Sequence, residues 1–176
     1  MENTTKPSRF SFNYLVLIVV TTLLCFSAYT YYESNHNERL FLANFEPAEN
    51  SYINLRGESS TATELNKAMD FYVQKDFEAA LPHFENYLAI EKNDFKAMLY
   101  AGISHLEVVQ LAKSIDLLET TRINAPQYFE AAGWYLALAH IRSEQLPKAR
   151  RILQETAKNE TNNYSKQAQE LLNSMP

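Results

Sequence analysis

The side chains of this chain that could do chemistry are few and widely separated. The histidines are His36, His83, His105 and His140, and the single cysteine is Cys25. None of them has the spacing of a metal site, and no serine lies in a nucleophile motif such as G-x-S-x-G. The sequence therefore predicts no enzyme, no bound metal and no cofactor.

The charged residues also indicate surface rather than a reactive site. The 176 residues include 21 Asp and Glu against 16 Lys and Arg, and the carboxylates are interleaved with lysines along predicted helices. Such interleaving is typical of a solvated helix face. An acidic chain lacks the basic footprint of a nucleic-acid-binding protein. Only three glycines are present, which leaves no glycine-rich phosphate loop.

Charge is unevenly distributed along the chain. Acids concentrate between residues 64 and 94, and bases concentrate between residues 142 and 158. Two interpretations stay open at this point. The asymmetry is ordinary surface variation, or it supports head-to-tail self-association or the docking of an acidic partner.

The elements that position these residues begin with an apolar run from Tyr14 to Tyr32, which reads YLVLIVVTTLLCFSAYTYY. It carries no charge, and its length suits a hydrocarbon core of roughly 30 Å when it is helical. Tyrosines at both ends match the aromatic belts of the two membrane interfaces. We expect a transmembrane helix over residues 14–32.

Flanking charges predict which way this helix lies. Lys6 and Arg9 precede the run, whereas Glu33 and Glu38 follow it and the next basic residue is Arg39. The positive-inside rule then places a short tail in the cytoplasm and the rest of the chain outside it. The prediction is a single-pass protein of a bacterial inner membrane with residues 1–13 cytoplasmic and its main domain periplasmic.

A cleaved leader is the alternative interpretation of the same run. Cleavage after Ser27 would place Cys25 at the −3 position, and a lipoprotein signal at Cys25 would follow Leu24, which is a large residue. The run is also long for a signal peptide. We therefore expect an uncleaved anchor.

Residues 33–60 form a juxtamembrane connecting segment in which Pro47 and Gly57 interrupt any regular pattern. Its LFLANF portion, residues 40–45, is compatible with a helix that continues from the membrane. Thr61-Ala-Thr-Glu64 then has the sequence of a capping box and predicts the start of a helical domain.

This domain contains three similar stretches. Ala68 and Gly102 are 34 residues apart, and Gly102 and Ala137 are 35 apart. Four further sets of residues keep this spacing: Phe71, His105 and His140; Phe77, Leu111 and Leu146; Ala80, Ser114 and Ala149; Phe84, Leu118 and Leu153. Small residues at two fixed points allow two helices to pack closely, and large apolar residues fill the space toward the next pair.

These residues resemble the tetratricopeptide repeat (TPR) family, which has a small residue in its first helix, an alanine in its second and a proline at the repeat end, here Pro126. The resemblance covers residues 61–158. It implies an all-α fold, a right-handed α-solenoid of three helix pairs at about 61–94, 95–128 and 129–158. A capping helix and tail follow over residues 159–176. The expected packing residues are Ala68, Ala80, Gly102, Ser114, Ala137 and Ala149.

The chain departs from the family pattern at several positions. Glu64 replaces the usual tryptophan or leucine of the first helix, and Lys92 replaces the final proline of the first repeat. Pro82 lies inside a predicted helix, where it removes a backbone hydrogen bond. The histidines at positions 105 and 140 align with Phe71, which predicts a partly buried packing role for both.

The resemblance also implies a ligand groove along the row of first helices. Carried over to this sequence, its positions are Leu65, Met69, Tyr72, Leu99, Ile103, Leu106, Trp134, Leu138 and Ile141. Family members that clamp a peptide carboxylate have Lys, Asn and Arg at such places, so that function is not expected here.

An open apolar row would be a liability in water, so something should cover it. The candidates are an apolar partner helix, a second copy of the chain, or the connecting segment with its Leu40, Phe41, Phe45 and Tyr52. Alternatively, the row is simply core.

The predicted function is a membrane-anchored scaffold or adaptor that binds a protein partner outside the cytoplasm. The alternative is a membrane regulatory or signalling partner, such as an anti-sigma or envelope-sensing accessory. Because the cytoplasmic tail is too short to fold, such a regulator would act through another membrane protein.

Overall fold

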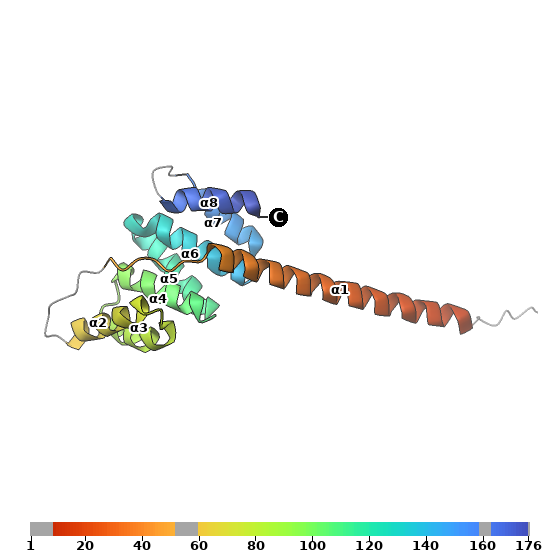
Figure 1. The fold of residues 1–176 in the computed structure, drawn as a ribbon, viewed down its shortest axis with the longest axis horizontal. Coiled ribbons are helices and arrows are strands. Elements are labelled where there is room, and N and C mark those ends of the chain that lie inside the picture. Colours follow the sequence, from red (N-terminus) through yellow and green to blue (C-terminus); the bar gives the residue numbers. More distant parts are fainter. Residues whose placement is uncertain (1–8, 52–59, 159–162, 176) are drawn as a thin grey trace, which may run out of the picture.

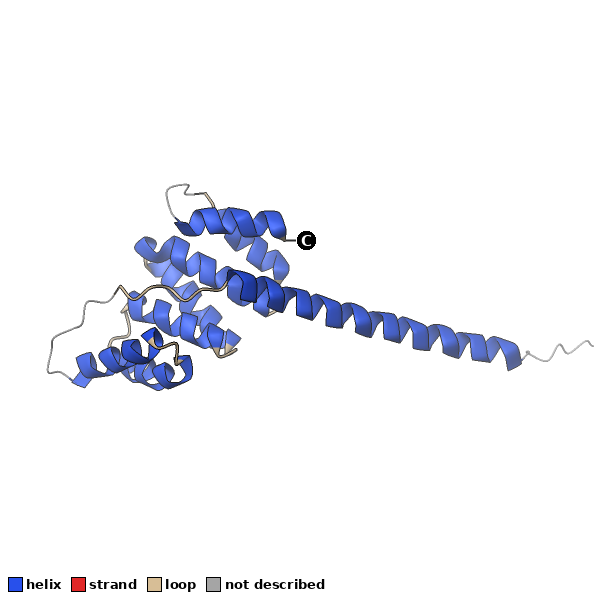
Figure 2. Cartoon of the chain, viewed as in Figure 1, coloured by secondary structure: helices blue, strands red, loops and turns tan. Residues whose placement is uncertain are grey.

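The computed structural model describes residues 9–51, 60–158 and 163–175, and within these ranges the regular secondary structure is entirely helical (Figures 1 and 2). Lys6, in the predicted cytoplasmic tail, and the connecting-segment residues Tyr52 and Gly57 lie outside the described part. An all-α fold was predicted, and the described residues confirm it.

The first element, α1 (Arg9–Asn44), is a single helix of 36 residues that extends far beyond the rest of the molecule (Figure 1). It is the one described helix long and apolar enough to cross a membrane. Large apolar side chains such as Leu24 and Phe26 are 64% and 68% exposed along it. The helix does not end at Tyr32. At ~1.5 Å per residue, its continuation to Asn44 adds about 18 Å beyond the apolar run.

The remaining helices form a compact body at the end of α1. They are α2 (Ser60–Val73), α3 (Phe77–Ile90), α4 (Phe95–Glu107), α5 (Leu111–Asn124), η1 (Pro126–Tyr128), α6 (Phe129–Arg142), α7 (Leu146–Thr156) and α8 (Asn163–Ser174). Neighbours in sequence pack together: α2 with α3, α4 with α5, and α6 with α7. Further contacts join α3 to α4, α5 to α6, and α7 to α8, so the body is a continuous array.

The turns inside the three pairs have the same backbone conformation. Lys75, Val109 and Glu144 have positive φ values of 60°, 64° and 62°, and they keep the spacing of the sequence repeat. In each turn, the residue directly after the one with positive φ donates its backbone N–H to the carbonyl five residues before it, over 2.8–2.9 Å. This left-handed residue ends one helix and reverses the chain for the next. The repeat is therefore present in backbone geometry as well as in sequence.

Helix boundaries follow local capping chemistry. The Asp76 carboxylate accepts from the Ala79 N–H at 3.1 Å, and that of Asp94 accepts from two N–H groups of the first turn of α4 at 3.0 Å. Pro147 lies in the first turn of α7, where its missing N–H has no cost. Pro82 lies inside α3, as expected. α2 begins at Ser60, within one residue of the predicted start, and α8 matches the predicted capping helix.

The small residues predicted to pack between helices are buried. Ala68, Ala80, Ser114, Ala137 and Ala149 are each 0% exposed. The Ser114 hydroxyl donates to the Gly102 carbonyl at 2.8 Å, which joins two of the predicted positions across α4 and α5. A Cβ at Gly102 would lie 2.8 Å from Leu118 Cγ, so the close approach needs a glycine.

The Ala80 position provides a test of this packing. Ala80→Leu would overpack the contact between helices and destabilise the domain by roughly 1–3 kcal/mol. Ala89→Leu is the matched control, because Ala89 is exposed on the same helix. Thermal unfolding followed by circular dichroism should show a lower Tm for the first variant only. Equal Tm values for both would contradict the packing.

Candidate functional site

The end of α1 docks on α6 and is part of the folded body. Phe41 is 0% exposed and Asn37 is 2% exposed, although both follow the apolar run closely. Phe45, at the end of the helix, packs edge-on against Tyr135 of α6 with ring centroids 6.2 Å apart. Helix α1 and the domain are thus joined through side-chain contacts as well as through the backbone.

Arg142, at the end of α6, holds this junction together. Its Nη2 and Nε donate to the two carboxylate oxygens of Glu38 at 2.9 and 3.1 Å. Its Nη1 donates to the backbone carbonyls of Leu106 and Glu107 on α4, at 2.8 and 3.2 Å. The guanidinium also lies 4.2 Å above the Phe41 ring. A bidentate pair of this kind fixes orientation as well as distance.

Beyond α1 the chain crosses the helices as a non-helical segment, residues 45–51, which we call the strap (Figure 1). Three tyrosine hydroxyls donate to its backbone carbonyls. Tyr135 donates to Glu46 at 2.7 Å, Tyr72 to Ala48 at 3.0 Å, and Tyr100 to Glu49 at 2.7 Å. These tyrosines come from α6, α2 and α4, so the strap bridges all three helix pairs.

Ser51 closes the far end of the strap. Its N–H donates to the Tyr100 hydroxyl at 3.0 Å, and its carbonyl accepts from the Lys96 ammonium at 2.7 Å. Burial raises the pKa values of Tyr72 and Tyr135, so both phenols stay protonated and keep donating. Every one of these contacts uses strap main chain. Two strap side chains add to these main-chain contacts: the Ser51 hydroxyl lies 3.0 Å from the Tyr100 hydroxyl, and Phe45 packs against Tyr135.

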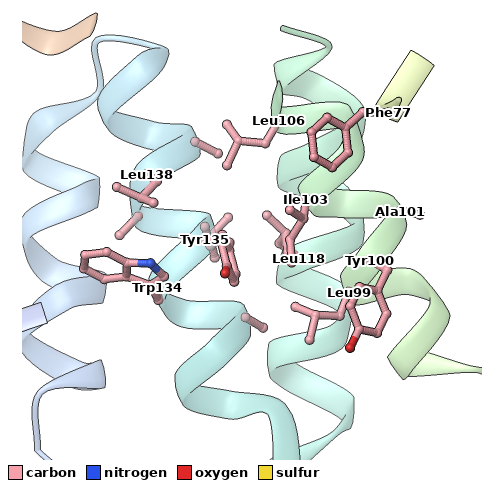
Figure 3. Close-up of a cluster of buried hydrophobic side chains, with 14 of the residues drawn as sticks. Phe77, Leu99, Tyr100, Ala101, Ile103, Leu106, Leu118, Trp134, Tyr135 and Leu138 are labelled. Carbon is pink, nitrogen blue, oxygen red and sulfur yellow. The ribbon is translucent and has the colours of Figure 1, made fainter. Parts of the chain in front are cut away.

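A cavity of about 580 Å³ lies between the strap and helices α4, α6 and α8. Leu99 and Tyr100 line it from α4, and Trp134 and Tyr135 line it from α6. Figure 3 shows Trp134, Tyr135, Leu99 and Tyr100 on these facing helices. Tyr164 of α8 completes the wall, with its ring 6.0 Å from that of Tyr135.

The predicted groove residues all lie in the interior of the described body. None is more than 5% exposed. Leu99 and Trp134 line the cavity, whereas seven others do not line it and belong to the hydrophobic core: Leu65, Met69, Tyr72, Ile103, Leu106, Leu138 and Ile141. Figure 3 shows Ile103, Leu106 and Leu138 among these core side chains. Their role in binding a partner stays a prediction.

The connecting segment was one of the three candidates for covering the apolar row, and its described part packs against this core. Phe41 is fully buried, and Leu40 and Phe45 are partly buried against the core. Of the three tyrosines that hold it, the sequence singled out Tyr72, as a groove position, but not Tyr100 or Tyr135. Tyr100 and Tyr135 recur 35 residues apart at equivalent positions, and this signal was available. The pairing of Arg142 with Glu38 has no local signal.

The histidines have packing and hydrogen-bonding roles. His105 and His140 are 2% and 6% exposed, and burial lowers the pKa of each below its ordinary value of 6.5. His83 lies 2.8 Å from the Glu64 carboxylate, and this bond is the main cause that lowers the pKa of Glu64 to about 2. The described residues contain no cluster of His, Cys, Asp and Glu suited to a metal.

The two regions of opposite charge also have contacts inside the molecule. Arg142 is engaged by Glu38, whereas Lys148 and Arg151 remain exposed on α7. Arg122 of α5 binds Glu155 of α7 at 2.6 Å. Part of the charge asymmetry therefore serves the fold.

Comparisons with protein-family models, with curated proteins and with solved structures found no match to this chain.

Removing Arg142 should loosen the junction. Arg142→Met keeps the apolar stem but leaves Glu38 and two carbonyls without their donor, at a cost of about 1–3 kcal/mol. Arg151→Met is the control, because Arg151 is exposed on α7. Denaturant unfolding of the full chain in detergent, followed by Trp134 fluorescence, should separate the two variants. Equal losses would show that the Arg142 contacts do not stabilise the junction.

The buried histidines predict a defined pH dependence. Both have depressed pKa values in the folded chain. As pH falls below 6.5, these two imidazoles therefore bind protons more readily in the unfolded state than in the folded state. Stability is then lost with acidification, although Glu85 near His105 and Glu119 near His140 oppose the effect.

The variant that replaces both His105 and His140 by Phe, the residue at the equivalent position 71, should lose less stability between pH 7.5 and 5.5 than the unchanged chain. Urea unfolding at the two pH values measures the difference. An unchanged pH dependence would contradict this account.

Proposed function

We propose that this chain is a membrane-anchored adaptor built from three TPR-type helix pairs in a right-handed α-solenoid, which holds a protein partner close to the membrane. Three features support the fold assignment: the sequence spacing of small and large residues, the pairwise packing of the helices, and the left-handed turn residues at Lys75, Val109 and Glu144. A stacked array of this kind offers an extended binding face.

The proposed location is a bacterial inner membrane with the helical domain in the periplasm. Lys6 and Arg9 before the apolar run support this orientation through the positive-inside rule. The domain after α1 contains no cysteine and so needs no oxidation to fold. α1 would then hold the domain against the outer surface of the membrane.

The observation that carries the adaptor function is the way the helices hold the strap. Hydroxyls from Tyr72, Tyr100 and Tyr135 bind three backbone carbonyls of one extended segment. A face that already binds extended polypeptide, with an unfilled cavity directly beside it, is suited to a segment of another protein.

A second candidate, a membrane regulatory partner, has its own supporting observation. α1 continues without interruption from the apolar run into the contact with α6, and Arg142 fixes the angle between them. A partner that moves the domain would therefore also move the transmembrane helix. Such a regulator would signal to another membrane protein.

Site-specific photo-crosslinking in native membranes tests the adaptor function. A photoreactive residue at Gln127, which is exposed and lines the cavity, should trap a specific partner chain. The same residue at Ile123, which is 69% exposed on α5 and does not line the cavity, is the control.

The trapped chain should be an extracytoplasmic or membrane protein. Identical products from both positions, or none from Gln127, would contradict the adaptor function. A cytoplasmic protein trapped at Gln127 alone would reverse the proposed orientation.

A further inference from the structure

The cavity beside the strap has the size of a binding site. Its volume of about 580 Å³ falls within the range of roughly 300–1,000 Å³ typical of ligand pockets. The strap forms one wall through Pro47 and Glu49, and α4, α6 and α8 form the others. Because the tyrosine hydroxyls are already occupied by strap carbonyls, the cavity is left to receive a side chain rather than another backbone.

Aromatic rings form part of the walls, beside polar and aliphatic residues that together outnumber them. Tyr128, Trp134, Tyr135 and Tyr164 line the cavity from α6, its preceding turn and α8. Aromatic faces carry partial negative charge and attract cations that approach within about 6 Å of the ring centre. The wall composition therefore favours a cationic group with an apolar stem.

The charges of the lining agree with this. Its carboxylates are those of Glu46, Glu49 and Glu130, and no lysine, arginine or histidine is among the described lining residues. Burial is the main cause that raises the pKa of Tyr135 and of Tyr164, and Glu46 and Glu49 add only the smallest contributions. Both phenols therefore remain neutral. The charged side chains of the lining are carboxylates, and the Lys96 ammonium lies at its margin, 2.7 Å from the Ser51 carbonyl.

The position of the cavity indicates where its occupant comes from. Leu99 and Tyr128 lie near the starts of α4 and α6, whereas Arg142, which contacts α1, lies at the opposite end of α6. The cavity begins where α1 ends, at Asn44, and continues along the strap, so it lies beyond the Glu38 contact when the chain is followed away from the apolar run. A lipid headgroup would not reach it, but a segment of another protein would.

We propose that this cavity receives a lysine or arginine side chain from an extended segment of the partner protein. The aromatic walls would contact its stem and cationic head, and Glu46 and Glu49 on the strap would balance its charge. This assignment rests on the proposed adaptor function.

The chain carries its own reporter for a test, because Trp134 is its only tryptophan and lines the cavity. The full-length protein in an uncharged maltoside detergent is titrated with acetyl-Ala-Ala-Lys-Ala-Ala-amide while Trp134 fluorescence is recorded. The analogue with norleucine in place of lysine has the same stem without the charge. The lysine peptide should give a saturable change that weakens with added salt, and the norleucine peptide should bind at least about fivefold more weakly.

Variants then locate the cation. Glu46→Gln and Glu49→Gln should each raise the Kd of the lysine peptide roughly three- to fivefold. Glu78→Gln is the control, because Glu78 is exposed on α3 and does not line the cavity. Equal affinities for the lysine and norleucine peptides, or an unchanged Kd in the Glu46→Gln/Glu49→Gln double variant, would overturn the assignment.

The crosslinking experiment separates this inference from the function on which it rests. If Gln127 traps a partner and the two peptides bind equally, the adaptor function stands and the cationic site is wrong. If the lysine peptide binds selectively and no partner is trapped, the cationic site stands and the adaptor function fails.

Discussion

The contact between Arg142 and the end of α1 is the constraint on which the rest of the molecule depends. One guanidinium binds the Glu38 carboxylate, two carbonyls of α4 and the face of Phe41. The Arg142 side chain is 12% exposed and that of Glu38 is 41% exposed, so the several contacts of one guanidinium, rather than the ion pair alone, hold the two helices together. Because Glu38 lies only six residues after Tyr32, fixing it also fixes the body at a short and constant distance from the apolar run, about 9 Å along the helix.

The position of the end of α1 determines where the strap begins. α1 ends at Asn44 directly beside α6, and the strap then meets Tyr135, Tyr72 and Tyr100, whose hydroxyls bind its carbonyls. Each such bond contributes only about 1 kcal/mol. Together they hold a segment that has no secondary structure of its own. The strap also forms one wall of the adjacent cavity.

The sequence predicted the helices well because their signals are local. Small residues at positions such as Gly102 and Ser114 recur at a fixed spacing, and their contact across α4 and α5 follows from it. The junction was not predictable in the same way. Glu38 and Arg142 are 104 residues apart, and their pairing depends on how the completed array presents α6. The strap was predictable in part: the apolar Phe45 marked the connecting segment as a candidate covering, whereas the hydrogen bonds to strap carbonyls leave no pattern in the residues that accept them. The row identified as a groove largely forms the core, since apolar periodicity alone does not distinguish the two.

The most direct test of this account is the distance between α1 and the domain in a bilayer. Spin labels at Ser27 on α1 and Ala89 on α3, with Cys25→Ser to remove the native thiol, allow double electron–electron resonance in lipid nanodiscs. Both labelled positions are exposed. A junction fixed by Arg142 predicts a single distance distribution only a few ångström wide, and the same in detergent as in lipid. A broad distribution would mean that the domain swings freely on its anchor, which would contradict the account.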